Sequence, residues 1–152
     1  MTTPLYYEDF AIGQKLESRR HYTIDREGAI HFAKEFDPQD QHLDDEKAKD
    51  SVFGELVVSG WHTAAATMRL KTETDLARIA GGLVGLGTES MRWPRPTMPG
   101  DTLRLVVTIL DKRLSQSKPG RGIIKYKVET FNQKGELMLE MFTNVIVPVR
   151  KV

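Results

Sequence analysis

The second half of the chain carries long stretches in which apolar and polar side chains alternate, and this pattern restricts the fold more than any other feature. In "TLRLVVTIL" the residues Leu103, Leu105, Val107 and Ile109 fall on one face, a period of two that is typical of a half-buried strand. Short turn sequences rich in Pro, Gly and Asn separate such stretches, so consecutive strands must run antiparallel. The predicted strands are 82–93, 102–110, 122–131 and 136–149, with turns at 98–101, 117–122 and 132–135.

The first half has helical periodicity instead. Within residues 20–36, apolar residues recur at the spacing of one helix face, with Thr23 and Asp25 available as caps. Pro38 lacks the N–H that a helix needs and disfavours helical geometry in the residue before it. We therefore predict that this helix ends near Asp37, and that residues 44–50 add one short helical turn.

A second, central helix is predicted to begin after Ser59 and Gly60. Trp61, Ala64, Ala65 and Met68 follow the spacing i, i+3, i+4, i+7, and the small alanines would let other backbone approach closely. We expect this face to be the buried one. Helices followed by a run of strands favour an α+β fold.

Size and charge bound the class of protein. The 152 residues suit one domain, 1–152, that buries a real core, and the formal net charge of +1 gives no basic excess for nucleic acid. The chain has no cysteine, which excludes disulfides, thiol nucleophiles and thiolate metal sites. Neither a signal pattern nor a membrane-length apolar run is present, so we expect a soluble cytoplasmic protein with no membrane partner. No His pair has zinc spacing, and no metal or other cofactor is expected.

The loop "FDPQDQH" (36–42) is the first candidate site. Asp37 and His42 could together bind a water molecule, one removing its proton while the other holds or returns it. A polar turn in which Asp37 caps backbone amides explains the same composition. Spacing alone favours the turn, so the site needs support from elsewhere in the chain.

That support comes from "SGWHTAAA" (59–66). A glycine at a helix start presents an unpaired backbone N–H where the helix dipole favours negative charge. Such an N–H is what an oxyanion hole requires. An ordinary helix entry is the alternative, but an acid–base pair followed about twenty residues later by an anion-seeking helix start indicates one constellation.

From about Tyr22 to the last strand the chain resembles the MaoC-like dehydratase family, which includes the (R)-specific enoyl-CoA hydratases. The family signature Gly-Asp-x-Asn-Pro-x-His matches at Asp37 and His42, and Gly60 matches the glycine whose N–H polarises the thioester carbonyl. "RWPRPTMPGDTL" (92–103) is similar to the segment that enters the family's later strands. The resemblance implies a hotdog fold, a long central helix wrapped by a curved antiparallel sheet, and a homodimer or higher homo-oligomer.

The same resemblance implies an enzyme, a hydro-lyase that adds water to an enoyl-CoA to give a 3-hydroxyacyl-CoA, the (R) isomer in this family. Asp37 and His42 would activate the water, with Asp37 returning the proton to the α-carbon, and the Gly60 N–H would stabilise the enolate. Residues expected to contact the acyl-CoA substrate are Ser59, Trp61, His62 and Arg121. Stacking or capping explains His62 equally well, and a solvated loop charge is the alternative for Arg121. A hotdog acyl-CoA thioesterase and a non-catalytic acyl-CoA-binding subunit remain alternatives, since fold alone does not determine chemistry.

The signature is altered at three positions. Phe36 replaces its glycine, Gln39 its asparagine and Asp40 its proline. A side chain at position 36 narrows the backbone choices beside Asp37. A second carboxylate at position 40 would raise a neighbouring carboxyl pKa.

Overall fold

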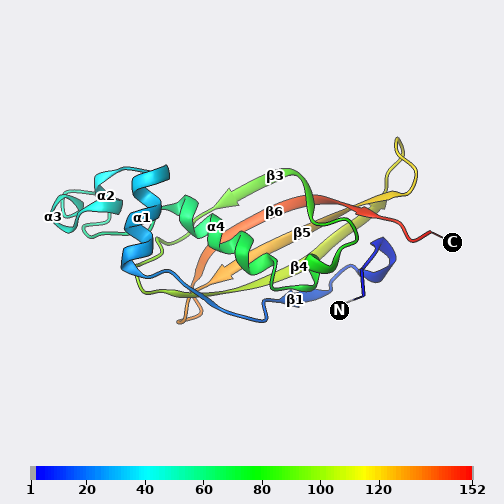
Figure 1. Ribbon diagram of the computed structural model, residues 1–152, viewed down its shortest axis with the longest axis horizontal. Coiled ribbons are helices and arrows are strands. Elements are labelled where there is room, and N and C mark those ends of the chain that lie inside the picture. Colours follow the sequence, from blue (N-terminus) through cyan, green and yellow to red (C-terminus); the bar gives the residue numbers. More distant parts are fainter. Residues whose placement is uncertain (1–2, 152) are drawn as a thin grey trace.

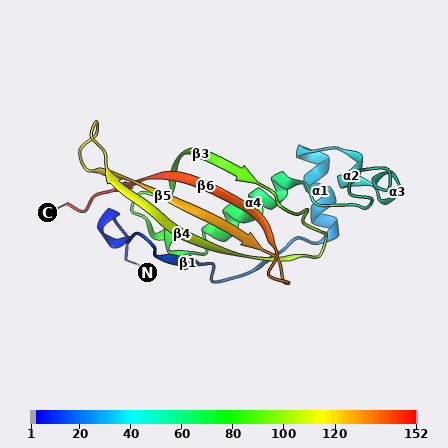
Figure 2. The same cartoon turned by 180° about the vertical axis from the view of Figure 1, so that it is seen from behind.

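The computed structural model describes residues 3–151, which form one long antiparallel sheet with a helix lying along one face (Figure 1). The strand order is β1-β4-β5-β6-β3, and the short strand β2 pairs separately with β4. Seen from behind, the opposite face of the sheet carries no helix of the described residues (Figure 2). The strands are β1 (Lys15–Glu17), β2 (Tyr22–Thr23), β3 (Val84–Arg92), β4 (Thr102–Leu114), β5 (Arg121–Phe131) and β6 (Leu137–Pro148).

The strands β4, β5 and β6 pair antiparallel in chain order, as predicted, and the preceding strand β3 pairs with β6 rather than with β4. Alternate residues of β4, from Leu103 to Ile109, are buried, as are Ile124, Tyr126 and Val128 of β5. Adjacent strands are in register across the sheet, with Val107 opposite Val128 and Val128 opposite Met141. These side chains therefore form one apolar surface against which the central helix packs. The strands β1 and β2 were not predicted, because two or three residues are too few to establish a period.

The central helix α4 (Gly60–Lys71) begins where predicted, and Ser59 caps it by accepting a hydrogen bond from the Trp61 N–H. The predicted buried face is wrong: Trp61 is 57% exposed and Met68 43% exposed. The side chains that face the sheet and α1 instead are His62, Thr63, Ala66, Thr67, Leu70 and Lys71. Apolar spacing misassigned the face because half of the buried positions are polar residues with tertiary hydrogen-bond partners.

Three helices gather at the end of the sheet where α4 begins, away from both chain termini (Figures 1 and 2). Helix α1 (Arg26–Phe36) starts at the predicted cap, with the Asp25 carboxylate accepting from the Gly28 N–H, and it ends before Pro38. Helix α3 (Asp45–Ala48) is the predicted short turn, capped by Asp44. Between them lies α2 (Asp40–Leu43), so His42 sits on a helical turn rather than in an open loop. A 3-10 turn at each of Tyr7–Asp9 (η1) and Asp75–Arg78 (η2) completes the fold.

At one edge of the sheet, no other strand of residues 3–151 lies beside the outermost strand. Strand β3 pairs with β6 on one side only, and nearly all of its residues are exposed. Two of its apolar side chains, Val84 and Leu86, are 49% and 54% exposed. No helix among the described residues is both long and apolar enough to cross a bilayer.

Candidate active site

Asp37 and His42 are brought together by the chain reversal that follows α1. Asp37 is the last residue tied to that helix, its N–H donating to the Ala33 carbonyl, and Pro38 then prevents another helical turn. The chain turns back through Gln39, whose carbonyl accepts from the His42 N–H at 2.9 Å. The spacing in the sequence thus becomes a contact: His42 Nε2 lies 3.3 Å from Asp37 Oδ2.

The hydrogen bond made by the other imidazole nitrogen, Nδ1, determines which nitrogen of His42 is basic. His42 Nδ1 lies 2.8 Å from the backbone carbonyl oxygen of Val57. A carbonyl oxygen can only accept, so Nδ1 carries a proton and donates it. In the neutral ring Nε2 is then left with the free lone pair, directed at Asp37. The His42 side chain is 7% exposed and the Asp37 side chain 15%, so the pair is shielded but reachable.

Ser59 joins Asp37 to the start of α4. Its hydroxyl donates to Asp37 Oδ2 at 2.6 Å, while Gln39 Nε2 donates to Oδ1 at the same distance. Burial opposes ionisation of this carboxyl, but the hydrogen bonds from Ser59 and Gln39 and the charge of His42 outweigh it. Together they hold the pKa of Asp37 below its usual value. Asp37 is therefore a carboxylate at neutral pH.

Gly60 supplies a free backbone donor next to this pair. As the first residue of α4 its N–H has no intrahelical partner, and no hydrogen bond from it is found among residues 3–151. The indole of Trp93 covers the glycine on one side and donates through Nε1 to the Gly60 carbonyl at 2.8 Å. A Cβ at position 60 would lie 2.9 Å from Trp93 Cε2, closer than real contacts allow. Only glycine permits this approach.

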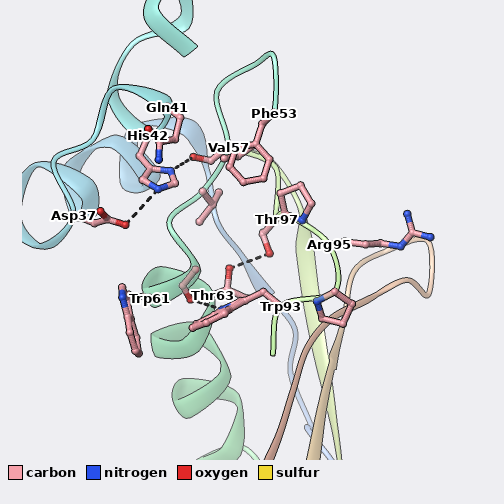
Figure 3. Close-up of a pocket in the computed structure, with 14 residues that line it drawn as sticks. Asp37, Gln41, His42, Phe53, Val57, Trp61, Thr63, Trp93, Arg95 and Thr97 are labelled. Carbon is pink, nitrogen blue, oxygen red and sulfur yellow. Dashed lines mark hydrogen bonds and ion pairs between the residues drawn. The ribbon is translucent and has the colours of Figure 1, made fainter. Parts of the chain in front are cut away.

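Asp37, His42 and Gly60 line one cavity of about 430 Å³. Figure 3 shows Asp37 and His42 facing each other at one end, with Trp61 and Trp93 further along and Arg95 extending away from the pair. The remaining wall is held by a hydrogen bond of 2.9 Å between the hydroxyls of Thr63 and Thr97. The lining residues are Asp37, Gln41, His42, Phe53, Val57, Val58, Gly60, Trp61, Thr63 and 93–97. Across the described chain, no three His, Cys, Asp or Glu side chains gather as a metal site would require.

Three of the four residues expected to contact substrate do not line this cavity. Ser59 is fully buried, and its hydroxyl donates to Asp37 instead. His62 is buried beneath α1, its ring stacked on Phe32 at a centroid distance of 4.4 Å. Burial lowers the pKa of His62 against the opposing charge of Asp25, and its Nδ1 has no partner among residues 3–151. Arg121 begins β5 at the far end of the sheet. Glu129 of the same strand is level with Arg92, which precedes Trp93 in the cavity wall. Arg121 therefore lies about 26 Å from the level of Arg92, measured along the strand axis.

Sequence reasoning missed Val57 and Trp93 as parts of the site. Val57 acts through its backbone, which no side-chain pattern reveals. Trp93 carried a weak signal, as an aromatic residue in the segment similar to the family's strand entry. Its stacking over Gly60 depends on a contact between positions 33 residues apart.

The altered signature leaves the geometry of the pair intact. Phe36 is 67% exposed, and no residue other than glycine within 3–151 has a positive φ, so the replaced glycine causes no strain. The expectation that Asp40 raises a neighbouring carboxyl pKa is wrong for Asp37. The Asp40 side chain is 65% exposed and lies 3.8 Å from Lys47, which draws it away from the pair.

Replacing Ser59 with Ala is expected to raise the pKa of Asp37, because it removes the hydrogen bond that does most to stabilise the carboxylate. It also removes the cap of α4, at a cost of about 1 kcal/mol in folding stability. An NMR titration of the Asp37 side-chain carboxyl carbon measures the shift directly. Gln39→Leu, which removes the other side-chain donor, should raise the pKa less. An unchanged titration in Ser59→Ala would contradict this role.

A long helix against one face of an antiparallel sheet, with an Asp–His pair at the helix start, defines a hotdog protein of the hydratase and dehydratase class. A family model described as "MaoC like domain" matches residues 9–131. The MaoC-like dehydratase from Rhodospirillum rubrum has a crystal structure with a TM-score of 0.91 and 42% identity, over 97% of this chain and 99% of that one. The chain belongs to the MaoC-like dehydratase family.

Two further comparisons extend this picture. The uncharacterized protein YdeM of Bacillus subtilis is 31% identical over 142 residues, which cover 92% of this chain and 96% of the relative. R-hydratase PhaJ1 of Pseudomonas aeruginosa shares the fold, with a TM-score of 0.73 and 24% identity over 98% of this chain and 89% of that one. The α+β hotdog architecture implied by the sequence is thereby confirmed.

Proposed function

We propose that this protein catalyses the reversible hydration of an enoyl-CoA thioester to a 3-hydroxyacyl-CoA. The observation that carries the proposal is the placement of Asp37, His42 and the free Gly60 N–H around one cavity. Hydration needs a base for water and a donor for the thioester oxygen that becomes negative. Those two needs are met by groups from α1, α2 and α4, which only the folded chain brings together.

The steps follow from the protonation of the pair. His42 Nε2 takes a proton from water while the hydroxide oxygen bonds to the β-carbon, and the carboxylate of Asp37 stabilises the imidazolium that forms. The electron pair of the double bond moves onto the thioester oxygen, where the Gly60 N–H stabilises the enolate. The imidazolium then returns its proton to the α-carbon, which completes the addition of one water.

In these steps the final proton reaches the α-carbon from His42 instead of from Asp37. The hydrogen bonds from Ser59 and Gln39 hold the pKa of Asp37 low, so its neutral acid form is scarce near neutral pH. A carboxylate that stays ionised orients water and supports a cation better than it delivers protons.

The test is incubation of the purified protein with crotonyl-CoA, following loss of the conjugated enoyl-thioester absorbance and assaying free CoA in parallel. Loss of absorbance without free CoA is the expected result. Release of CoA would identify a thioesterase instead. Binding without turnover, for crotonyl-CoA and for branched and longer enoyl-CoAs alike, would identify a binding subunit and overturn the proposal.

We also propose that two copies pair along β3 to form a homodimer. The proposal rests on an edge strand with unpaired backbone and exposed apolar side chains, which proteins normally cover. Two β3 strands pairing antiparallel would form a closed, symmetric contact. That pairing would bring Arg121 of the second copy toward Trp93 of the first, where it could meet the phosphates of CoA.

Leu86→Lys is expected to convert the dimer to a monomer, because it places a charge in the middle of the proposed contact. Sedimentation velocity measures the change. Ile12→Lys is the matched control, since Ile12 is 63% exposed but lies outside β3. A wild-type protein that sediments as a monomer would contradict the proposed pairing.

A further inference from the structure

A second cavity, of about 290 Å³, lies between the C-terminal half of α4 and the sheet, and it contains a buried lysine. Lys71 is 6% exposed, and its ammonium donates to the hydroxyl of Tyr126 at 3.1 Å. Tyr126 is fully buried. Apolar side chains and two threonines surround these groups. The lining residues are Met68, Lys71, Leu83, Gly85, Gly87, Thr88, Tyr126, Met141, Thr143 and Val145.

Lys71 lacks a counter-charge in the described chain. Among residues 3–151, no carboxylate forms an ion pair with it. Its ammonium donates a hydrogen bond to the hydroxyl of Tyr126 and makes a cation–π contact with the ring of the same residue. Burial lowers the pKa of Lys71, which reflects the cost of holding the charge there. A buried charge is normally paired, and an ammonium has three donors, of which one is used here. A methionine would fill this position at lower cost, so packing alone does not explain a lysine.

Lys71 lies on the same helix as the proposed active site, in a cavity separate from it. Lys71 follows Gly60 by eleven residues on α4, about three turns, so the two lie on nearly the same side of the helix and roughly 16 Å apart. Strand β3 runs beside the helix between them, with Trp93 at the Gly60 end and Leu83 at the Lys71 end. Gly85 and Gly87 carry no side chains, which leaves room at the Lys71 end.

We propose that Lys71 and Tyr126 bind a carboxylate at the far end of the acyl chain, so that the enzyme acts on ω-carboxylated enoyl thioesters. This inference rests on the proposed hydratase function. Helix side chains lean toward the N-terminus, so the lysine reaches back and leaves a gap of roughly 10 Å to the thioester carbon. An extended chain advances about 3.6 Å for every three bonds, so the gap corresponds to an acyl group of roughly eight to ten carbons.

Binding is measured first, so that the inference is tested apart from turnover. Isothermal titration compares octanoyl-CoA with its ω-carboxylated analogue, in the wild type and in Lys71→Met, which keeps an unbranched side chain one atom shorter and removes the charge. The wild type should bind the carboxylated ligand more tightly than octanoyl-CoA. In Lys71→Met the ratio of the two affinities should fall by about 10- to 100-fold. Tyr126→Phe, which retains the ring, should lose a smaller part of it. Equal affinities of the wild type for both ligands would overturn the inference.

Turnover and stability complete the test. Hydration of eight-carbon and ten-carbon 2-enoyl-CoAs, with and without a terminal carboxylate, should show the same preference in kcat/KM. If the wild type binds with this preference but hydrates neither series, the hydratase function fails while the carboxylate subsite stands. Lys71→Met should melt at the same or a higher temperature than the wild type without ligand, because it removes an unpaired buried charge. A lower melting temperature or a lost dimer would show that Lys71 serves a partner within the protein, and would overturn the inference.

Discussion

Asp37→Asn is expected to reduce kcat for enoyl-CoA hydration by about 10²- to 10⁴-fold, the range typical of a lost acid–base group. The substitution keeps the shape of the side chain but removes the negative charge beside the imidazole. An asparagine amide at the same position can also donate to His42 Nε2, 3.3 Å from the present carboxylate oxygen, and so occupy the lone pair that must accept a proton from water. The first effect leaves the developing imidazolium without its counter-charge, and the second blocks the base before water can be deprotonated.

His42→Ala should lose activity to a similar extent, and the double variant should lose little more than either single one. Groups that act as a unit are not additive, because removing one member disables the other. The measurement is kcat and KM for crotonyl-CoA across the set. Substrate binding should survive, since the cavity walls are otherwise unchanged.

Asp40→Asn is the matched control for the aspartate. It removes a carboxylate three residues further along, which is exposed and directed at Lys47. Its activity should equal that of the wild type. If Asp37→Asn retains most of its activity, or if Asp40→Asn loses as much as Asp37→Asn, the role assigned to Asp37 beside His42 is wrong.

Gly60→Ala is expected to lower kcat by about 10²- to 10³-fold, the cost of losing one oxyanion donor. The new Cβ would lie 2.9 Å and 3.0 Å from two atoms of the Trp93 indole. The ring cannot retreat freely, because its Nε1 is bonded to the carbonyl of the same glycine. The start of α4 must then shift, and the N–H moves away from the thioester oxygen.

A second substitution tests whether the clash between the new methyl group and Trp93 causes the loss of activity. In Gly60→Ala/Trp93→Leu the smaller side chain leaves space for the methyl, so the double variant should regain activity relative to Gly60→Ala. Gly85→Ala is the control, because a Cβ there meets nothing within 4 Å. With crotonyl-CoA, too short to reach that position, Gly85→Ala should behave as the wild type. Full activity in Gly60→Ala would remove the oxyanion role.

Local patterns predicted the long elements and most of their ends, although β4 runs to Leu114, four residues beyond the predicted end, and the short elements β1, β2 and α2 were missed. The alternation in β4 and β5 depends on neighbours two residues apart, and the buried residues Leu103, Val107 and Val128 follow it. The caps Asp25 and Ser59 bind N–H groups within three residues of themselves. Such features depend on short-range geometry, so the sequence alone carries them.

In the candidate site, too, short-range features followed from the sequence and long-range contacts did not. The sequence by itself determined that Asp37 ends a helix, that His42 follows at a turn's distance, and that Gly60 opens another helix. Only the tertiary structure decided that these segments meet, that the Val57 carbonyl leaves His42 Nε2 as the basic nitrogen, and that the polar face of α4 is buried, with Lys71 inside. The physical reason is that burial, tautomer and charge pairing depend on partners far along the chain. A helix records its own period but not which of its faces the sheet will cover.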